Sequence, residues 1–247
     1  MLAVPHTVDV AGCAVGALDR AAWAAHLARC VAAGPGHHHV SLNAAKWRAM
    51  QRAAPLRRAV RAAPSVAAAG AGIRAAARWL GRPLPGRATG CDLAHDLLAR
   101  AADAGWPVAL LGAAPDVVDA VAARWRGVGV DVAYARCGYF APDEERGVAR
   151  AIAEAAPALL LVATGTPRAE LFVARWAPVL QVPLAMGVGG AFDVMAGRTP
   201  RAPDGVGAAG LEWAWRLAHA PRARFRRAVL GSAGFAAAIA RGDRLPP

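Results

Sequence analysis

The sequence predicts an α/β fold, in which a Rossmann-like, mostly parallel sheet carries helices on both faces and a basic helical appendage follows at the C-terminus. Short apolar runs recur along the chain, and each is followed by a loop of small residues and an amphipathic segment. Strands that alternate with helices in this way form parallel sheets that are buried on both faces. The 247 residues, 56% of them hydrophobic, supply a full core and exclude a disordered chain.

The strands and helices of this fold are expected at the following places. Strands are expected at 40–43, 108–112, 130–136, 158–162 and 184–188, and helices at 93–104, 116–126, 144–155 and 168–177. No internal repeat or low-complexity linker interrupts the alternation. We therefore expect an α/β domain over residues 1–207 and the basic helical appendage over residues 208–247.

The net charge of +12 comes almost entirely from arginine, since Lys46 is the one lysine among 29 basic residues. The abundance of Arg, Ala, Gly and Pro is also typical of a compositional bias without functional meaning. From Glu212 to the end, however, seven arginines stand against Glu212 and Asp243. Such a tail suits phosphates, nucleic acid or an anionic membrane surface, and equally a solvated helix face. No aromatic platform or reader motif accompanies the charge, so no nucleic-acid partner is expected.

The sequence shows no pattern typical of a targeting segment and no spacing typical of metal ligands. The first 15 residues lack a basic region followed by an apolar stretch, and the apolar stretch 229–240 is too short to span a bilayer, so a cytoplasmic location is expected. Four scattered cysteines have no metal-finger spacing and are expected to be reduced and mostly buried. Because adjacent side chains do not converge on one ion, His37-His38-His39 predicts no metal site, and no cofactor is expected.

Two strand-to-helix turns begin alike. Gly112 is followed by Pro115 and Asp116, and Gly165 is followed by Thr166, Pro167 and Glu170, as at helix starts. Helix N-termini at the carboxyl ends of parallel strands offer unpaired N–H groups to phosphates. Neither turn matches a dinucleotide or P-loop motif, and each alone is also compatible with an ordinary tight turn.

Two aspartates and a glycine-rich loop could each have a structural or a functional role. Asp92 could cap the helix 93–104 or act as a general base, which must reach a hydroxyl proton. Gly187-Val-Gly-Gly190 follows a strand and permits close approach of a ligand to the backbone. Asp193 could contact that ligand or pair with an arginine of 198–203.

The tail combines apolar stripes with arginines. Trp213 and Leu217 are four residues apart, as are Phe225 and Val229, and Pro221 separates the two segments. Arginines beside such stripes suit binding of a diphosphate or docking on anionic lipid. An apolar surface on the tail could also support a homo-oligomer.

Nine segments, in this order, resemble the WecG/TagA/CpsF glycosyltransferases, glycosyltransferase family 26. They run from about residue 40 to about residue 227: Val40-Ser-Leu-Asn43, Ala77-Arg-Trp-Leu-Gly81, Arg87-Ala-Thr-Gly-Cys-Asp-Leu93, Leu110-Leu-Gly-Ala-Ala-Pro115, Cys137-Gly-Tyr-Phe140, Leu161-Val-Ala-Thr-Gly-Thr-Pro167 with Glu170, Gly187-Val-Gly-Gly-Ala-Phe-Asp193, Arg201-Ala-Pro203 and Leu211-Glu-Trp-Ala-Trp-Arg-Leu217. One such motif would be weak, whereas nine in register make chance resemblance very improbable.

The resemblance implies an inverting, metal-independent hexosyl- or N-acetylhexosaminyltransferase. Its donor would be a UDP-sugar and its acceptor a polyprenyl-diphosphate-linked saccharide, used for exopolysaccharide, teichoic acid or a similar cell-surface polymer. The enzyme would be cytoplasmic and peripheral at the anionic inner face of the cell membrane. The resemblance also implies the site residues. The catalytic base would be Asp92, and the substrate-binding residues would be Asn43, Thr89, Gly112, Gly165, Thr166, Pro167, Glu170, Gly189, Gly190, Asp193, Arg216, Arg222 and Arg226.

The sequence departs from the family pattern at three places. Ala169 stands where glutamine is usual, Ala69 where aspartate is common, and Asp204-Gly205 where an aromatic residue often follows Arg201-Ala-Pro203. Loss of an amide that contacts the donor could cost roughly 1–3 kcal/mol of binding free energy. The alternative function is therefore a catalytically weakened member that binds a nucleotide sugar or a partner protein.

Overall fold

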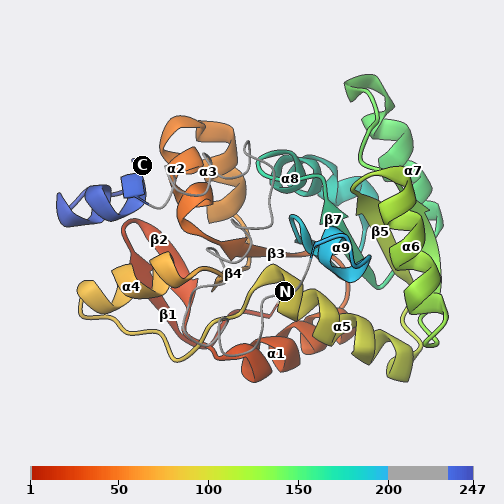
Figure 1. The fold of residues 1–247 in the computed structure, drawn as a ribbon, viewed down its shortest axis with the longest axis horizontal. Coiled ribbons are helices and arrows are strands. Elements are labelled where there is room, and N and C mark those ends of the chain that lie inside the picture. The colour runs from red at the N-terminus through yellow and green to blue at the C-terminus, as the bar shows by residue number, and fades with distance from the viewer. Residues whose placement is uncertain (1, 200–232, 247) are drawn as a thin grey trace.

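A six-stranded parallel sheet forms the centre of the molecule (Figure 1). The computed structural model describes residues 2–199 and 233–246. The strand order is β4-β3-β8-β7-β5-β6, and each of the five pairings between neighbours is parallel. The strands are β3 (His37–Leu42), β4 (Ser65–Ala68), β5 (Val108–Gly112), β6 (Val132–Arg136), β7 (Leu159–Ala163) and β8 (Leu184–Gly187).

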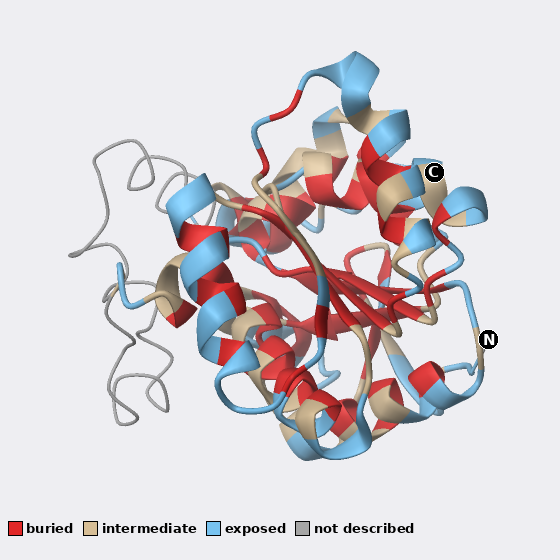
Figure 2. Ribbon diagram, turned by 90° about the vertical axis from the view of Figure 1, so that its right-hand side faces the viewer, coloured by how far each residue is buried: buried red, intermediate tan, exposed pale blue. Residues whose placement is uncertain are grey.

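Helices cover both faces of this sheet, as the sequence predicts. One face carries α1 (Arg20–Ala32), α5 (Gly90–Ala104), α6 (Pro115–Arg126) and α9 (Ala191–Met195), whose apolar residues form one core cluster with alternate residues of β5, β7 and β8. The other face carries α7 (Glu145–Glu154), which follows the 3-10 turn Pro142–Glu144, and α8 (Arg168–Leu180). In Figure 2 the central strands are almost entirely buried, because side chains from both layers cover them.

A third core cluster lies at the β3–β4 edge. It joins the antiparallel hairpin of β1 (Thr7–Val10) and β2 (Cys13–Gly16) to α2 (Ala44–Arg52), α3 (Ala54–Arg61) and α4 (Ala71–Trp79). Residues 233–240 form a further helix, and Phe235 and Ile239 pack into the same cluster. Leu245 donates its backbone N–H to the carbonyl of Ala11. The described end of the predicted appendage is therefore part of the α/β core, whereas the 207/208 boundary lies outside the described residues.

The predicted elements are present, with shifted ends. The strand 108–112 is confirmed to the residue as β5, while β3 begins three residues before the predicted 40–43 because the buried histidines 37–39 belong to it. The helix α5 begins at Gly90 rather than at Leu93. The helix α8 continues past the predicted 177 to Leu180, with Pro178 inside its last turn.

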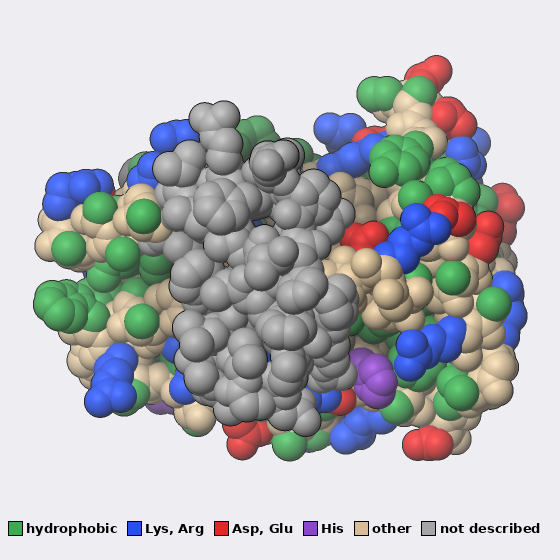
Figure 3. Space-filling view, viewed as in Figure 1, with side chains coloured by type: hydrophobic (Ala, Val, Ile, Leu, Met, Phe, Trp, Pro, Cys, Tyr) green, Lys and Arg blue, Asp and Glu red, His purple; other side chains and the backbone are tan. Residues whose placement is uncertain are grey.

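The four cysteines are free thiols. Cys13 and Cys30 are buried, but Cys91 and Cys137 are only partly so, and the expectation of mostly buried cysteines holds for two of the four. In the described part of the chain, no helix has the length and apolar character needed to cross a membrane. On the part of the face that Figure 3 colours, Lys and Arg side chains lie at both its left and its right.

Candidate active site

A cavity of about 310 Å³ opens at the carboxyl ends of β3, β4, β7 and β8. The lining comes from five segments of the chain, each at or just after the end of a strand or at the start of α5. The lining residues are Ser41, Asn43, Ala44, Ala45, Lys46, Ala69, Gly70, Ala71, Gly72, Arg87, Thr89, Gly90, Cys91, Gly165, Thr166, Ala169, Glu170, Gly187, Val188, Gly189 and Gly190. In open parallel sheets this edge is where ligands bind.

Five helices begin at this cavity: α2, α4, α5, α8 and α9. Two of them are capped by a side chain, since Asn43 accepts a hydrogen bond from the N–H of Lys46 and Thr89 accepts one from the N–H of Asp92. The N-termini of α4, α8 and α9 have no side-chain cap. Unpaired N–H groups and the positive ends of helix dipoles attract anions, so the cavity is preorganised for a negatively charged ligand.

Two glycines of the cavity wall have little room or an unusual backbone. A Cβ at Gly187 would lie 3.1 Å from Oε1 of Glu170 and 3.2 Å from the Cβ of Ala169. A side chain at this place on β8 would therefore press on the first turn of α8. At Gly165 the backbone has φ +77°, a left-handed conformation that other residues adopt at a cost.

A buried ion pair joins two walls of the cavity. Nζ of Lys46 on α2 lies 2.7 Å from Oε1 of Glu170 on α8, with side-chain exposures of 6% and 2%. The same ammonium group donates a hydrogen bond to the carbonyl of Ser41, 2.8 Å away, and Thr166 donates a long one to Glu170. Because each charge is compensated inside the protein, the pair fixes α2 against α8 and adds no net charge to the cavity.

Asp92, at the third position of α5, directly follows the lining residues Thr89, Gly90 and Cys91 in the chain, but it is not itself one of the residues that line the cavity. Its Oδ2 accepts a 2.7 Å hydrogen bond from the Thr89 hydroxyl, and guanidinium groups of Arg20 and Arg87 lie 3.8 and 3.9 Å from its carboxylate. The prediction that Asp92 caps the helix is wrong. Thr89 is the capping residue, and Asp92 returns a contact to that cap from inside the first turn.

The structure brings together seven of the predicted substrate-binding residues. They are Asn43, Thr89, Gly165, Thr166, Glu170, Gly189 and Gly190. Gly112, Pro167 and Asp193 do not line the cavity, although Pro167 is the residue from which α8 starts. The positions Arg216, Arg222 and Arg226 lie outside the described residues.

Gly112 and Asp193 lie outside the cavity lining, and the described chain shows other contacts for both. A Cβ at Gly112 would lie 2.5 Å from the backbone of Ala163, so this glycine serves the contact between β5 and β7. Arg198, one of the arginines expected to pair with Asp193, pairs with Asp116 instead. The backbone carbonyl of Asp193 accepts hydrogen bonds from the N–H groups of Arg198 and Thr199.

Sequence reasoning missed several cavity residues, notably Ser41, Lys46, Arg87 and the loop 69–72. Lys46 did carry a signal, because it is the single lysine in a chain with 28 arginines. Such a position favours a compact ammonium group over a larger, planar guanidinium. Ser41 and the loop give no such signal. Their place in the cavity follows from the pairing of β3 with β4.

The Glycosyl transferase WecG/TagA/CpsF family model matches residues 8–245. The chain belongs to the WecG/TagA/CpsF family of glycosyltransferases. It is therefore an enzyme of a family that acts in the synthesis of cell-surface polysaccharides, with a nucleotide-sugar donor and a saccharide acceptor. The match extends over the hairpin and over residues 233–245, which also pack into the core.

Two of the three departures from the WecG/TagA/CpsF pattern lie in the cavity wall. Ala69 follows β4, and Ala169 lies in the first turn of α8 beside the ion-paired Glu170. Both replace larger polar residues with a methyl group. The cavity wall therefore has methyl groups at these two helix starts, beside the glycines and the buried ion pair of Lys46 with Glu170.

Proposed function

We propose that the cavity binds the diphosphate of a UDP-sugar and that the enzyme transfers the sugar, with inversion, to a polyprenyl-diphosphate-linked saccharide. The convergence of five helix starts on one cavity carries this proposal. Three of these N-termini lack a side-chain cap. Ala169 and Ala191 donate their N–H groups to backbone carbonyls, and the other N–H groups of these first turns are the fixed donors that we propose for the diphosphate. The glycines of the β8 loop, Gly189 and Gly190, let the ligand approach the backbone closely.

Charge inside the cavity supports the same ligand. Among the lining residues that the structure describes, Glu170 is the one carboxylate, and Lys46 compensates it at 2.7 Å. Arg87 also lines the cavity and contributes a guanidinium, a group suited to phosphate. With the acidic charge compensated, a diphosphate meets helix dipoles and a cation and encounters no uncompensated carboxylate on the described wall.

The mechanism that we propose is a direct displacement at the anomeric carbon. A hydroxyl of the acceptor attacks that carbon, a base takes the hydroxyl proton, and the UDP diphosphate leaves from the opposite face with inversion. Preorganised N–H groups of α4, α8 and α9 stabilise the charge that develops on the leaving diphosphate. No step of this displacement requires a metal.

Asp92 is our proposed base. It follows the lining residues 89–91 in the chain, and its carboxylate contacts two of the lining residues, Thr89 and Arg87, as well as Arg20. Glu170 is the competing carboxylate, but its bond to Lys46 and its 2% exposure commit it to the ion pair. A general base must come within hydrogen-bond reach of the acceptor hydroxyl, so the acceptor is proposed to enter beside the start of α5.

One assay tests both the activity and the base. The protein is incubated with a panel of UDP-sugars and a short-chain polyprenyl-diphosphate sugar, and UDP release is measured for the parent, Asp92→Asn and Glu170→Gln. The proposal predicts acceptor-dependent release by the parent and at least a 100-fold loss in Asp92→Asn with unchanged UDP affinity. Equal release by the parent and Asp92→Asn would remove Asp92 from the mechanism.

The arginines of the tail are proposed to complete the site and to hold the enzyme on the inner membrane face. Deleting the tail is a poor test, because Phe235 and Ile239 pack into the core. We suggest a triple variant, Arg216→Gln, Arg222→Gln and Arg226→Gln, which keeps that packing. We expect it to lose both transfer activity and sedimentation with anionic vesicles, and full retention of both would refute the proposal.

The alternative is a weakened family member that binds a nucleotide sugar or a partner without turnover. The methyl groups of Ala69 and Ala169 on the cavity wall favour it. The two functions differ in one outcome of the assay. Tight UDP-sugar binding without UDP release, for every donor and acceptor, would favour the binding function.

A further inference from the structure

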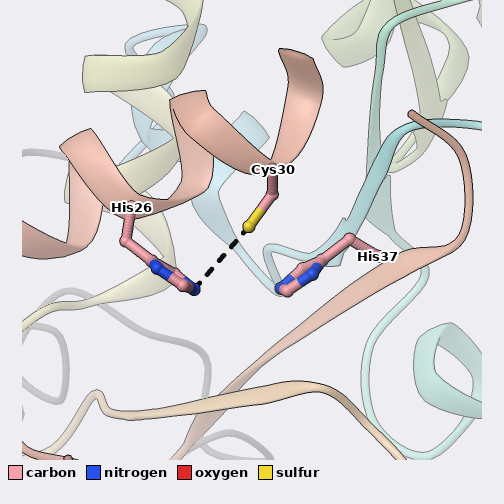
Figure 4. Close-up of side chains that lie close together, drawn as sticks. All are labelled: His26, Cys30 and His37. Carbon is pink, nitrogen blue, oxygen red and sulfur yellow. Dashed lines mark hydrogen bonds between the residues drawn. The ribbon is translucent and has the colours of Figure 1, made fainter. Parts of the chain in front are cut away.

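Three buried side chains that could ligate a metal gather away from the cavity. His26 and Cys30 lie four residues apart on one side of α1, and His37 is the first residue of β3. Figure 4 shows the imidazole of His26 and the thiol of Cys30 turned toward the ring of His37. At most 2% of any of the three residues is exposed, so the cluster is closed to bulk solvent.

The spacing of the ligand atoms suits one ion. Sγ of Cys30 lies 3.6 Å from Nε2 of His26. Two ligands on a tetrahedral zinc, with bonds of about 2.3 Å to sulfur and about 2.0 Å to nitrogen, are separated by roughly 3.6 Å. One atom from each residue lies within 4.8 Å of the other two. Since 4.8 Å is an upper limit and ligands of one tetrahedral ion lie closer together, binding would draw the three side chains inward.

The ring of His37 has the partner that metal-bound histidines usually have. Ser65 on β4 places its hydroxyl 2.8 Å from Nε2 of His37, and Nδ1 of the same ring is buried without a hydrogen-bond partner among the described residues. A metal-bound imidazole is generally oriented by a hydrogen bond on its other nitrogen. The Ser65 hydroxyl thus leaves Nδ1 as the ring nitrogen available for an ion.

The protonation states also suit ligation. Burial lowers the pKa of His37 to about 4, and burial together with the Arg29 charge lowers the pKa of His26. Metal ligands must be neutral imidazoles, and a lowered pKa favours that form in both rings. Burial also raises the pKa of the Cys30 thiol, which opposes formation of the thiolate that a metal needs.

We propose that His26, Cys30 and His37 form a binding site for one thiolate-binding transition-metal ion, Zn²⁺ or Cu⁺. Binding forms one bond to sulfur and two to imidazole nitrogen, and the Cys30 thiol releases one proton to solvent. One thiolate and two neutral imidazoles select such ions over Mg²⁺ or Ca²⁺, which prefer oxygen. Cu⁺ with one thiolate has no net charge and is the better match for a buried site, whereas Zn²⁺ leaves one positive charge.

The place of the cluster indicates a structural ion. His37 begins β3, whereas the cavity lies at the other end of that strand, five residues or about 16 Å away. The ion would link α1 to β3. It would not contact the donor, and the proposed transfer mechanism does not depend on it.

Metal binding is tested on the full chain without a histidine tag. Zn²⁺, Cu⁺ under reducing conditions, and Mg²⁺ as a negative control are each titrated against a chromophoric competing chelator. We expect one equivalent of Zn²⁺ or Cu⁺ to be bound by the parent and by Cys13→Ser, which removes another buried cysteine. Cys30→Ser should lose that equivalent, and Ser65→Ala should bind about 10- to 100-fold more weakly.

A second measurement does not depend on how the variants fold. An ion that binds only the native state raises the unfolding temperature of the parent, and the rise grows with the logarithm of the free ion concentration above the Kd. We expect this rise with Zn²⁺ or Cu⁺ and none with Mg²⁺. The proposal is overturned if neither ion binds stoichiometrically or stabilises the parent, or if a well-folded Cys30→Ser binds as the parent does.

Discussion

The turns that follow β7 and β5 start from neighbouring strands but contribute differently to the molecule. Both precede helices without a side-chain cap, α8 and α6. The β7 turn lines the cavity with Gly165 and Thr166, whereas the β5 turn is covered by Gly138 of the loop after β6, whose N–H binds the carbonyl of Ala113. A helix start is therefore a ligand site only where the space in front of it is open.

The neighbours of each turn explain this difference. Beyond β7 lie β8 and β3, whose loops also lead into helices that begin at the cavity. Beyond β5 lies the edge strand β6, and Arg168 holds its following loop in place by donating to the carbonyls of Gly138 and Phe140. The predictions below use this contrast between the open β7 turn and the closed β5 turn.

The largest effect on stability is expected at the ion pair that joins α2 to α8, the helix that follows β7. Lys46→Met leaves the Glu170 carboxylate buried without its cation and should lower the free energy of unfolding by about 3–5 kcal/mol. Urea unfolding measures the loss. The double variant Lys46→Met/Glu170→Leu, which removes both charges, should recover most of it. If the double variant is as unstable as the single one, the instability does not come from an uncompensated charge.

A methyl group in the closed β5 turn should lower the stability of the protein and leave its affinity for UDP unchanged. Gly112→Ala places a Cβ 2.5 Å from the Ala163 backbone at φ +132°, so we expect a loss of roughly 3 kcal/mol in unfolding free energy. UDP affinity of the folded protein, measured by calorimetry, should not change. A weaker UDP affinity with unchanged stability would show that this turn does contact the ligand.

A smaller effect is expected from restoring an amide in the open turn. Ala169→Gln returns a polar side chain to the cavity wall beside Glu170. A new hydrogen bond to the donor should strengthen UDP-sugar binding by about 1 kcal/mol, or five- to tenfold. Calorimetry with UDP and UDP-sugars separates the contribution of the sugar. No change with any donor would mean that the missing amide does not explain donor choice.

The sheet could be predicted from the sequence because its strands are continuous apolar runs. Val108–Gly112 is buried on both faces and was predicted to the residue. The N-terminal hairpin and α1 gave no comparable signal, since Thr7–Val10 alternates weakly and α1 is rich in alanine. The start of α5 was predicted at Leu93 because Asp92 is a residue type that caps helices, whereas Thr89 accepts the N–H bond and α5 begins at Gly90.

The cavity residues that could be predicted from the sequence are those whose residue type indicates a turn or a helix start. Glycines after a strand and the Thr166-Pro167 helix start were found in this way, and the cavity contains Gly165, Thr166, Gly189 and Gly190. The ion pair of Lys46 with Glu170 joins positions more than a hundred residues apart, and the order of β3, β8 and β7 in the sheet brings them together. Sequence spacing contains no information about that order.

The central claim is that the open helix starts bind the donor diphosphate, and a matched pair of variants tests it most directly. Gly70→Asp and Ala114→Asp each place a carboxylate at an uncapped helix N-terminus, on α4 in the cavity and on α6 at the closed turn. Both should leave the fold intact or stabilise it slightly. We predict by calorimetry that Gly70→Asp weakens UDP binding at least tenfold and that Ala114→Asp leaves it unchanged. Equal UDP affinity in the two variants would contradict the account.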